Sequence, residues 1–405
     1  MFRTTSPWTR AGIAVLATAA VTMGGCSADS GDSTGGSSDK TFRILAIMPL
    51  SGQLASIGGA TQTAMKAAVN VINAEGGANG KQIEVKYVDD AGTPTQAVNV
   101  LQKELNSGTK YDFAFLGSTS GEAIPMVQAA SQRKLLNCSQ AASDALNKGA
   151  TYPYFFGAAT SASGTAAGVV NQVKQEGRKS VALLVADTEL GASVNDAISA
   201  DLGKEGIKFA SQKLDPTATD ATAQLEKLRA GNPDVLLLDA YGPSAAVMLA
   251  SVKKLGWQIP VIGTADLAAN DFASIPPASY EGITVNSISL NVTGTSVTTS
   301  PEFTVFRDAM IKESGGKLQF AAETYASAYS CVLLARAAAD IAKSTDPEKM
   351  RTALESVKDA SQVKGWFACP KIGFSESNRK PTFAPTDYVA AKPGQRKDML
   401  LPSAS

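Results

Sequence analysis

Phe113-Ala-Phe-Leu-Gly117, followed by Ser118-Thr-Ser-Gly121, is the stretch of sequence that decides the fold. A helix-like run from Ala123 to Arg133 comes next, and a second apolar segment, Leu135-Leu-Asn-Cys138, follows it. Strand, helix and strand in this order and at this spacing predict a βαβ unit. The two strands are therefore expected to be parallel and to belong to one sheet.

Both strands are followed by small and hydroxyl-bearing residues, with Ser120 after the first and Ser139-Gln-Ala-Ala-Ser-Asp144 after the second. Ligands of open α/β sheets bind outside the carboxyl ends of the parallel strands. Small residues let backbone N–H groups approach a ligand, and Ser120 and Ser143 add hydroxyl donors. The pattern suits a small carboxylate or carbonyl compound. The alternative is that these residues form two ordinary polar turns, and this stretch taken alone favours that alternative.

Composition narrows the class of protein. The 405 residues are enough for two domains with their own cores, and 44% apolar with 18% charged residues is typical of a globular chain. Lys+Arg and Asp+Glu both number 37, so no basic excess points to nucleic acid. Histidine is absent, which removes Ser-His-Asp and Cys-His catalysis and the commonest zinc ligand. These absences argue against an enzyme of these classes and against a typical zinc site.

The N-terminal segment has the pattern of an export signal. Arg3 and Arg10 precede an apolar run from Ala11 to Met23, which is too short to span a membrane and ends in Gly-Gly-Cys26. This ending resembles a bacterial lipoprotein signal, so 1–25 is predicted to be removed and Cys26 to carry the lipid. The alternative is plain secretion with cleavage nearby.

The segment 26–40 is rich in Ser, Gly and Asp and lacks an apolar pattern, so it is expected to be a flexible tether. A lipid, a slack linker and a large soluble body together predict a protein outside the cytoplasm that is anchored to the cell membrane. Export also permits disulfides. Cys138, Cys331 and Cys369 are an odd number, and Cys331–Cys369 is the expected pair because Cys138 lies at a strand end.

The rest of the chain alternates between strand and helix patterns and restarts once. The predicted strands are 41–48, 83–88, 180–186, 207–213, 235–238, 260–263 and 283–290, with helices between most of them. A second alternating unit beginning near residue 180 predicts two lobes. The helical segments 301–313 and 323–342 have no strands of their own and are expected to return to the first lobe. Short strands are expected within 366–374 and 382–390.

Laid out in this way, the chain resembles the branched-chain amino-acid (leucine/isoleucine/valine) binding proteins, the type I periplasmic solute-binding proteins of ABC importers. The resemblance extends from residue 42 to about 390 and lies in the order and spacing of short motifs. These motifs are Pro49-Leu-Ser-Gly52, Asn73-Ala-Glu-Gly-Gly77, Tyr87-Val-Asp-Asp90, Thr93-Pro-Thr-Gln-Ala97, Ser139-Gln-Ala-Ala-Ser-Asp144, Tyr241-Gly-Pro243 and Lys253-Lys-Leu-Gly-Trp257.

The resemblance implies an α/β fold with two doubly wound parallel-sheet lobes, joined by a hinge of three crossovers. The first lobe would hold 42–158 and 286–370, and the second 159–285 and 371–405. Small ligands bind between the lobes of this family. No cofactor is implied, and the protein is expected to be a monomer.

The resemblance also implies roles in ligand binding for individual residues. Ser120 corresponds to the serine that contacts the ligand carboxylate, and Ala141 to the position that offers backbone groups. Ser139, which begins the same motif, is also expected to be a ligand-binding residue. Ser143 takes the place of a threonine at the α-amino-acid head, and Tyr241 that of an aromatic residue that closes over the ligand.

Three positions depart from the family pattern. The acid that pairs with the ligand ammonium falls on Ala265, and the acid here is Asp266, one residue along; Asp266 is equally well explained as a helix N-cap. A tryptophan of the first loop is replaced by Ile57, and a tyrosine of the second lobe by Leu190. The expected ligand is therefore an amino acid, an amide or another small carboxylate.

Together these patterns predict a lipid-anchored solute-binding protein that captures its ligand by hinge closure and delivers it to ABC permease subunits. A ligand sensor of the same fold that reports to a signalling receptor is the main alternative. An exported amidase and a structural envelope lipoprotein are the others; the absence of histidine argues against the amidase.

Overall fold

The stretch from Phe113 to Cys138 forms the predicted strand–helix–strand unit. The computed structural model of the protein describes residues 40–369 and 371–403. In it, β3 (Phe113–Leu116) and β4 (Asn137–Cys138) pair in parallel, and α3 (Ser120–Gln132) connects them. The helix begins three residues earlier than predicted because Thr119, in an extended conformation, is its N-cap. The hydroxyl-bearing run is therefore the N-terminus of a helix and only partly a loop.

The first lobe is built on a four-stranded parallel sheet with the strand order β2–β1–β3–β4. Its other two strands are β1 (Thr41–Met48) and β2 (Gln82–Asp89). From Ile44 to Met48, β1 is an unbroken apolar and buried run, as expected for a strand that is covered on both faces.

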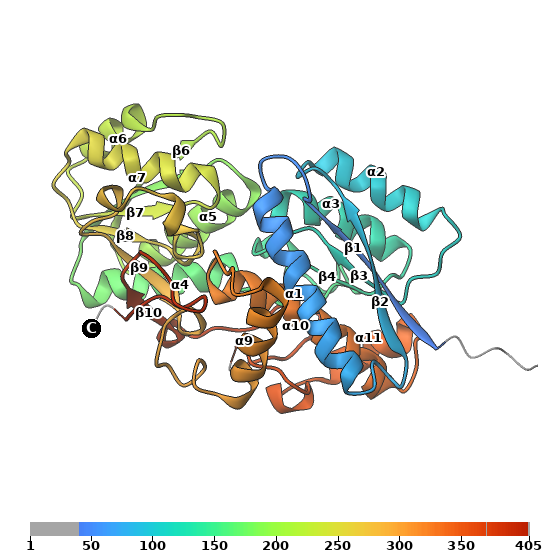
Figure 1. Ribbon diagram of the computed structural model, residues 1–405. Helices are drawn as coiled ribbons and strands as arrows, with labels where there is room; N and C mark the ends of the chain where they lie inside the picture. The colour runs from blue at the N-terminus through green and yellow to red at the C-terminus, as the bar shows by residue number, and fades with distance from the viewer. Residues whose placement is uncertain (1–39, 370, 404–405) are drawn as a thin grey trace, which may run out of the picture. The chain divides into compact units, whose positions relative to one another are not determined.

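Helices cover both faces of this sheet (Figure 1). They are α1 (Ala55–Ala74), α2 (Pro94–Leu105), α3, α9 (Pro301–Ser314), α10 (Ala322–Ala342) and α11 (Pro347–Ser356). The alanine-rich α10 is buried along most of its length and packs against α1 and α11. The helices α9 and α10 pack against α1, on the lobe where they were expected, whereas α11 was not predicted.

The second lobe is built on a six-stranded sheet with the order β10–β9–β8–β7–β5–β6. Its strands are β5 (Ser180–Ala186), β6 (Lys208–Leu214), β7 (Val235–Asp239), β8 (Val261–Gly263), β9 (Thr284–Ile288) and β10 (Tyr388–Ala391), of which β10 alone is antiparallel. Its helices are α4 (Ala162–Gln175), α5 (Glu189–Lys204), α6 (Thr222–Arg229), α7 (Pro243–Leu255) and α8 (Ala265–Ala268). The predicted type I fold, with two α/β lobes on largely parallel sheets, is confirmed.

The structure moves two of the expected lobe boundaries. Strand β9 hydrogen-bonds within the six-stranded sheet, so the second lobe continues to about residue 288 and does not end at 285. Residues 371–380 pack on the first lobe, because Gly157 N–H donates to Arg379 O and Ile372 and Phe374 join its core. The last connection therefore returns to the second lobe only near β10. The expected strands in 366–374 and 382–390 reduce to β10 and isolated bridges, since the first segment contains a proline and a glycine and the second contains Pro385.

The predicted disulfide Cys331–Cys369 is wrong. The bridge joins Cys138 to Cys331, whose Cα atoms are 5.7 Å apart, and Cys369 is a buried free thiol that donates to Lys371 O. The middle of α10 packs over the end of β4, which brings Cys331 to a strand end that sequence spacing does not reveal. The bridge therefore lies within the first lobe.

The signal segment 1–25, the lipid-carrying Cys26 and nearly all of the tether lie outside the described residues. Among the helices of the described part, none has the length and apolar character needed to cross a membrane.

Candidate functional site

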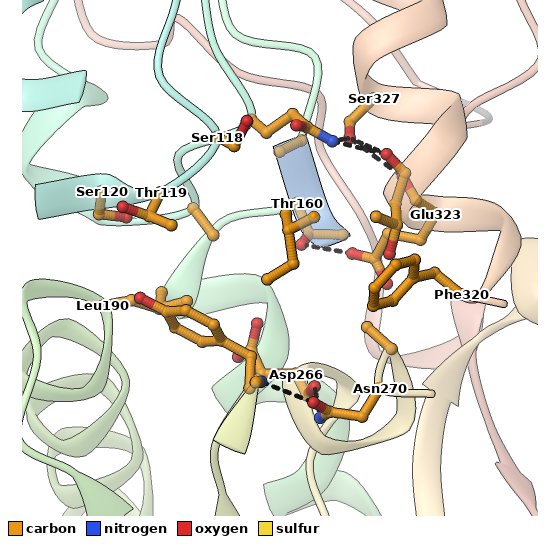
Figure 2. Close-up of a pocket in the computed structure, with 18 residues that line it drawn as sticks. Ser118, Thr119, Ser120, Thr160, Leu190, Asp266, Asn270, Phe320, Glu323 and Ser327 are labelled. Atoms are coloured by element: carbon orange, nitrogen blue, oxygen red, sulfur yellow. Dashed lines mark hydrogen bonds between the residues drawn. The ribbon is translucent and has the colours of Figure 1, made fainter. Parts of the chain in front are cut away.

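A pocket lies between the carboxyl ends of strands from both lobes (Figure 2). The first lobe contributes α1, the N-terminus of α3, the segment after β4 and the first turns of α10. The second lobe contributes the start of α5, the loop after β7 and α8. Parallel strands in both sheets direct their carboxyl ends to this place, which is where α/β folds bind ligands.

Five of the predicted site residues line this pocket: Ile57, Ser120, Leu190, Tyr241 and Asp266. The structure thus brings together residues that are more than two hundred positions apart in the sequence.

The other three predicted residues, Ser139, Ala141 and Ser143, are buried directly behind the pocket wall, and Gln140 and Ala142 line it in their place. Ser139 Oγ accepts from Ala141 N–H at 3.1 Å, and Ser143 Oγ caps Ala145 N–H at 3.2 Å. Contact between these three residues and a ligand stays a prediction.

The first-lobe wall carries a row of hydroxyl groups at the start of α3, namely Ser118, Thr119 and Ser120 (Figure 2). Ser120 Oγ accepts a hydrogen bond from Ser143 N–H at 3.1 Å. The free N–H groups and the dipole of a helix N-terminus favour an anion, so this end of the pocket is suited to a carboxylate.

A buried acid lies beneath the same helix terminus. Glu122, in the first turn of α3, accepts from Ser118 N–H at 3.2 Å. Burial, with a smaller effect of Asp90, raises the pKa of Glu122 to about 7. Protonation of Glu122, which its raised pKa makes easier, removes a negative charge from the positive end of the helix dipole.

Gln140 connects two parts of the first-lobe wall. Its Oε1 accepts from Thr61 Oγ1 at 2.6 Å, and its Nε2 donates to Ser327 Oγ at 3.0 Å and to Thr324 O. The residue thereby joins α1, the segment after β4 and α10. The side chain was not singled out in the sequence, where it is one residue of a small polar motif.

The second-lobe wall is acidic. Asp266 lies in the first turn of α8, and Thr264, not Asp266, is the N-cap of that helix. Burial and the neighbouring Asp239 carboxyl raise the pKa of Asp266 well above its ordinary value. Asp239 accepts from Thr264 Oγ1 at 2.6 Å, and burial raises its pKa to about 6. The one-residue offset therefore still places the carboxyl of Asp266 at the pocket, with its buried Oδ2 lacking a hydrogen-bond partner among the described residues.

A second acid, Glu323, was missed by the sequence reasoning and faces the pocket from the first turn of α10 (Figure 2). Thr160 Oγ1 donates to its Oε1 at 3.0 Å, and Asn291 Nδ2 donates to its Oε2 at 3.1 Å. Burial, with a smaller effect of Asp266, raises its pKa to about 7. A signal was available: Glu323 is an acid in the first turn of an otherwise largely apolar helix.

Asn270 holds the second-lobe wall together. Its Oδ1 accepts from Gly242 N–H at 2.7 Å, while its Nδ2 donates to Ala240 O at 2.9 Å and to Asp266 O at 3.0 Å. These bonds fix the loop that carries Tyr241 against α8. Burial raises the pKa of Tyr241 to about 12, so its hydroxyl is a neutral donor at physiological pH.

Charge and polarity differ between the ends of the pocket. No lysine or arginine is among the described residues that line it, so Asp266 and Glu323 have no cationic partner there. Ile57, Leu190 and Phe320 supply an apolar surface between the polar ends. Within 40–369 and 371–403, no group of three or more His, Cys, Asp or Glu side chains is arranged to hold a metal.

Comparison with known proteins identifies the family. A family model described as periplasmic binding protein matches residues 41–384. The chain is 26% identical to the Leu/Ile/Val-binding protein BraC3 of Rhizobium johnstonii, over 79% of this chain and 84% of that protein. It is 23% identical to the leucine-, isoleucine-, valine-, threonine- and alanine-binding protein of Pseudomonas aeruginosa, over 89% of this chain and 92% of that protein.

A solved structure of a periplasmic binding protein type 1 from Bordetella pertussis has the same fold. The TM-score is 0.77 at 20% identity, and the match covers 87% of this chain and 96% of that one. Since the family model spans most of the chain, the protein belongs to the periplasmic binding protein family, and its fold is that of the type 1 protein from Bordetella pertussis.

Proposed function

We propose that this protein binds a small amino-acid-like solute in the pocket between its lobes, closes over it, and delivers it to an ABC importer. The observation that carries the proposal is the polarity of the pocket. A helix N-terminus with three hydroxyl groups lies at one wall, and two acids without a cationic partner among the described lining residues lie at others. An α-amino acid presents the complementary carboxylate and ammonium groups.

The carboxylate is assigned to the N-terminus of α3. Backbone N–H groups at this terminus and the hydroxyl of Ser120 would donate to it, and hydrogen bonds to a charged group contribute about 1.5–3 kcal/mol each. The raised pKa of Glu122 lets this carboxyl take up a proton when the anion binds, which avoids repulsion between them.

The ammonium is assigned to Asp266, assisted by Glu323. Both carboxyls hold protons more tightly than usual because they are buried and close to another acid. A bound cation stabilises their ionised forms, so ligand binding would release protons. Amides and simple carboxylates lack the cation and would leave these acids protonated.

Hinge closure is the proposed way in which the site excludes water. Three connections join the lobes, between η1 (Asp144–Leu146) and α4, between β9 and α9, and between α11 and β10. Tyr241 and Asp266 belong to one lobe and Ser120 to the other, so a ligand held by both favours the closed arrangement. Removal of water strengthens each polar contact.

Transport also needs a location next to the permease. The proposed lipid on Cys26 and the tether 26–40 would hold the binding domain at the outer surface of the membrane. Mass spectrometry of the mature N-terminus tests this: a diacylated Cys26 is expected, and Cys26→Ser should release the protein from membranes. An unmodified N-terminus elsewhere in the chain would contradict the anchor.

Thermal unfolding with a panel of ligands tests the binding proposal. Aliphatic, polar and aromatic amino acids, short amides and simple carboxylates would be added one at a time. A ligand present at a hundred times its dissociation constant adds about 2.7 kcal/mol to the free energy of unfolding. A raised midpoint with aliphatic amino acids is expected. A response to amides or carboxylates only would remove the role of Asp266, and no response to any compound would contradict the proposal.

A further inference from the structure

Lys380 is a buried lysine behind the binding pocket. It lies in the connection between α11 and β10, and its side chain is fully shielded from solvent. Its Nζ donates to Ala141 O at 2.8 Å and to Ser143 O at 2.9 Å. These two carbonyls belong to the segment after β4, about 240 residues earlier in the chain.

The burial of the Lys380 ammonium costs free energy, which its hydrogen bonds must offset. No salt bridge to Lys380 occurs within 40–369 and 371–403, and burial lowers the pKa of its ammonium to about 7, with Asp144 and Asp266 opposing the shift. Removing an ammonium from water is costly unless its protons are bonded. The two carbonyl groups provide those bonds, and they converge on one point where they would otherwise repel each other.

The segment that Lys380 holds shapes the wall of the pocket. Between the two bonded carbonyls lies Ala142, which lines the pocket. The N–H of Ser143 donates to Ser120 Oγ at the N-terminus of α3. The carbonyl of Ser143 thus accepts from Lys380, and its N–H donates to Ser120.

We propose that Lys380 is a positioning residue for ligand binding: by donating to Ala141 O and Ser143 O it holds the 141–143 segment in the shape that the ligand requires. Lys380 lies in the last of the three connections between the lobes, so the shape of the first-lobe wall depends on a segment that also joins the lobes. The inference rests on the proposed function for its effect on affinity, but not for its effect on the segment itself.

Two substitutions separate hydrogen-bond donation from packing. Lys380→Met keeps the length and apolar bulk of the side chain but removes the donor. Lys380→Gln fills less of the space but retains an N–H₂ group that can donate to a carbonyl. If Lys380 positions the segment, the Gln variant should be closer to the wild type than the Met variant; if Lys380 only fills space, the order should reverse. Lys371→Met, at an exposed lysine of the same connection, is the matched control.

The first measurement is hydrogen–deuterium exchange of the ligand-free full-length protein, followed on peptides that cover 139–146. We expect exchange at these amides to accelerate at least tenfold in Lys380→Met, to change less in Lys380→Gln, and to stay unchanged in Lys371→Met. Equal exchange in the wild type and both Lys380 variants would overturn the inference. This result does not depend on any ligand.

The second measurement is calorimetric titration with L-leucine. The dissociation constant is expected to rise about tenfold in Lys380→Met and less in Lys380→Gln, with Lys371→Met unchanged. Unaltered affinity in both Lys380 variants would overturn the positioning role. If L-leucine fails to bind the wild type, the proposed amino-acid specificity fails, and the exchange experiment still decides the inference. If Lys380→Met does not fold, Lys380→Gln is compared with Lys371→Met: faster exchange over 139–146 together with weaker L-leucine binding in Lys380→Gln supports the inference, and values equal to those of Lys371→Met overturn it.

Discussion

The hydroxyl of Ser120 accepts a hydrogen bond from the backbone N–H of Ser143 at 3.1 Å, which joins the N-terminus of α3 to the segment after β4. In the sequence the two serines have the same kind of position, since each follows a strand of the same βαβ unit. In the structure they differ: Ser120 lines the pocket, whereas the hydroxyl of Ser143 caps Ala145 N–H behind it. They should therefore respond differently to removal of the hydroxyl group.

Ser120→Ala is expected to weaken L-leucine binding ten- to a hundredfold, because it removes a donor to the carboxylate worth about 1.5–3 kcal/mol. It also leaves the buried Ser143 N–H without its acceptor. Ser143→Ala should lower the free energy of unfolding by about 1 kcal/mol through the lost cap and affect binding less. Calorimetry and urea unfolding measure both effects, with Ser199→Ala on the exposed face of α5 as the control. Equal effects of the two variants on affinity would contradict the assignment.

Glu323 should make stability depend on pH. In the folded protein its pKa is raised from the ordinary 4.5 to about 7 by burial. The folded state then binds more protons than the unfolded chain between these two values, so the free energy of unfolding falls as pH rises through this window. One group contributes a slope of at most about 1.4 kcal/mol per pH unit. Glu323→Gln should flatten the dependence and stabilise the ligand-free protein above pH 7.

Chemical denaturation at a series of pH values between 4 and 8 measures this slope. The other acids with raised pKa values remain in both proteins, so the difference between the curves reports Glu323 together with its interaction with Asp266; these acids are Asp90, Glu122, Asp239 and Asp266. The exposed Glu281→Gln is the matched control. Parallel curves for the wild type and Glu323→Gln would show that Glu323 titrates normally.

Ligand binding should shift the carboxyls of Asp266 and Glu323 towards their ionised forms. An ammonium next to Asp266 and Glu323 favours their carboxylates, so L-leucine binding is expected to release protons at pH 6, where Glu122, with a pKa of about 7, is still largely protonated and does not repel the ligand carboxylate. Titrations in buffers of different ionisation enthalpy count these protons. In Glu323→Gln the count should fall. Proton uptake on binding would contradict the assignment of the ammonium.

The Cys138–Cys331 bridge should contribute to stability. Closing a loop between residues 193 positions apart restricts the unfolded chain, and bridges of this kind contribute about 3–5 kcal/mol. The double variant Cys138→Ala/Cys331→Ala should lose this amount in urea unfolding, and peptide mapping without reduction should find the two cysteines linked. Cys369→Ala serves as control because it leaves the bridge intact. A map that links Cys331 to Cys369 would contradict the structure.

Much of the architecture was predictable because it follows from local patterns. Buried parallel strands such as β1 and β5 are continuous apolar runs, and helices such as α2 begin at recognisable caps, here Thr93 before Pro94. The connection after α11 was not predictable in the same way, because residues 371–380 are held by tertiary contacts. Arg379, for example, is bonded to Glu355 and lies over the ring of Phe156.

The lining of the pocket was predictable where residues follow strand ends. Ser120, Tyr241 and Asp266 all do, and the strand ends converge on the pocket. Glu323, Asn270 and Lys380 belong to segments whose position depends on how the chain returns to each lobe. For the same reason the disulfide partner of Cys331 depends on how α10 packs over β4, a relationship between segments almost two hundred residues apart.

The most direct test of the account compares three ligands of matched shape by calorimetric titration: L-leucine, 4-methylpentanoate, which lacks the ammonium, and 3-methylbutylamine, which lacks the carboxylate. We expect L-leucine to bind at least a hundredfold more tightly than either, because it alone can engage both the N-terminus of α3 and the acids Asp266 and Glu323. Equal binding of L-leucine and 4-methylpentanoate, or no binding of L-leucine, would contradict it.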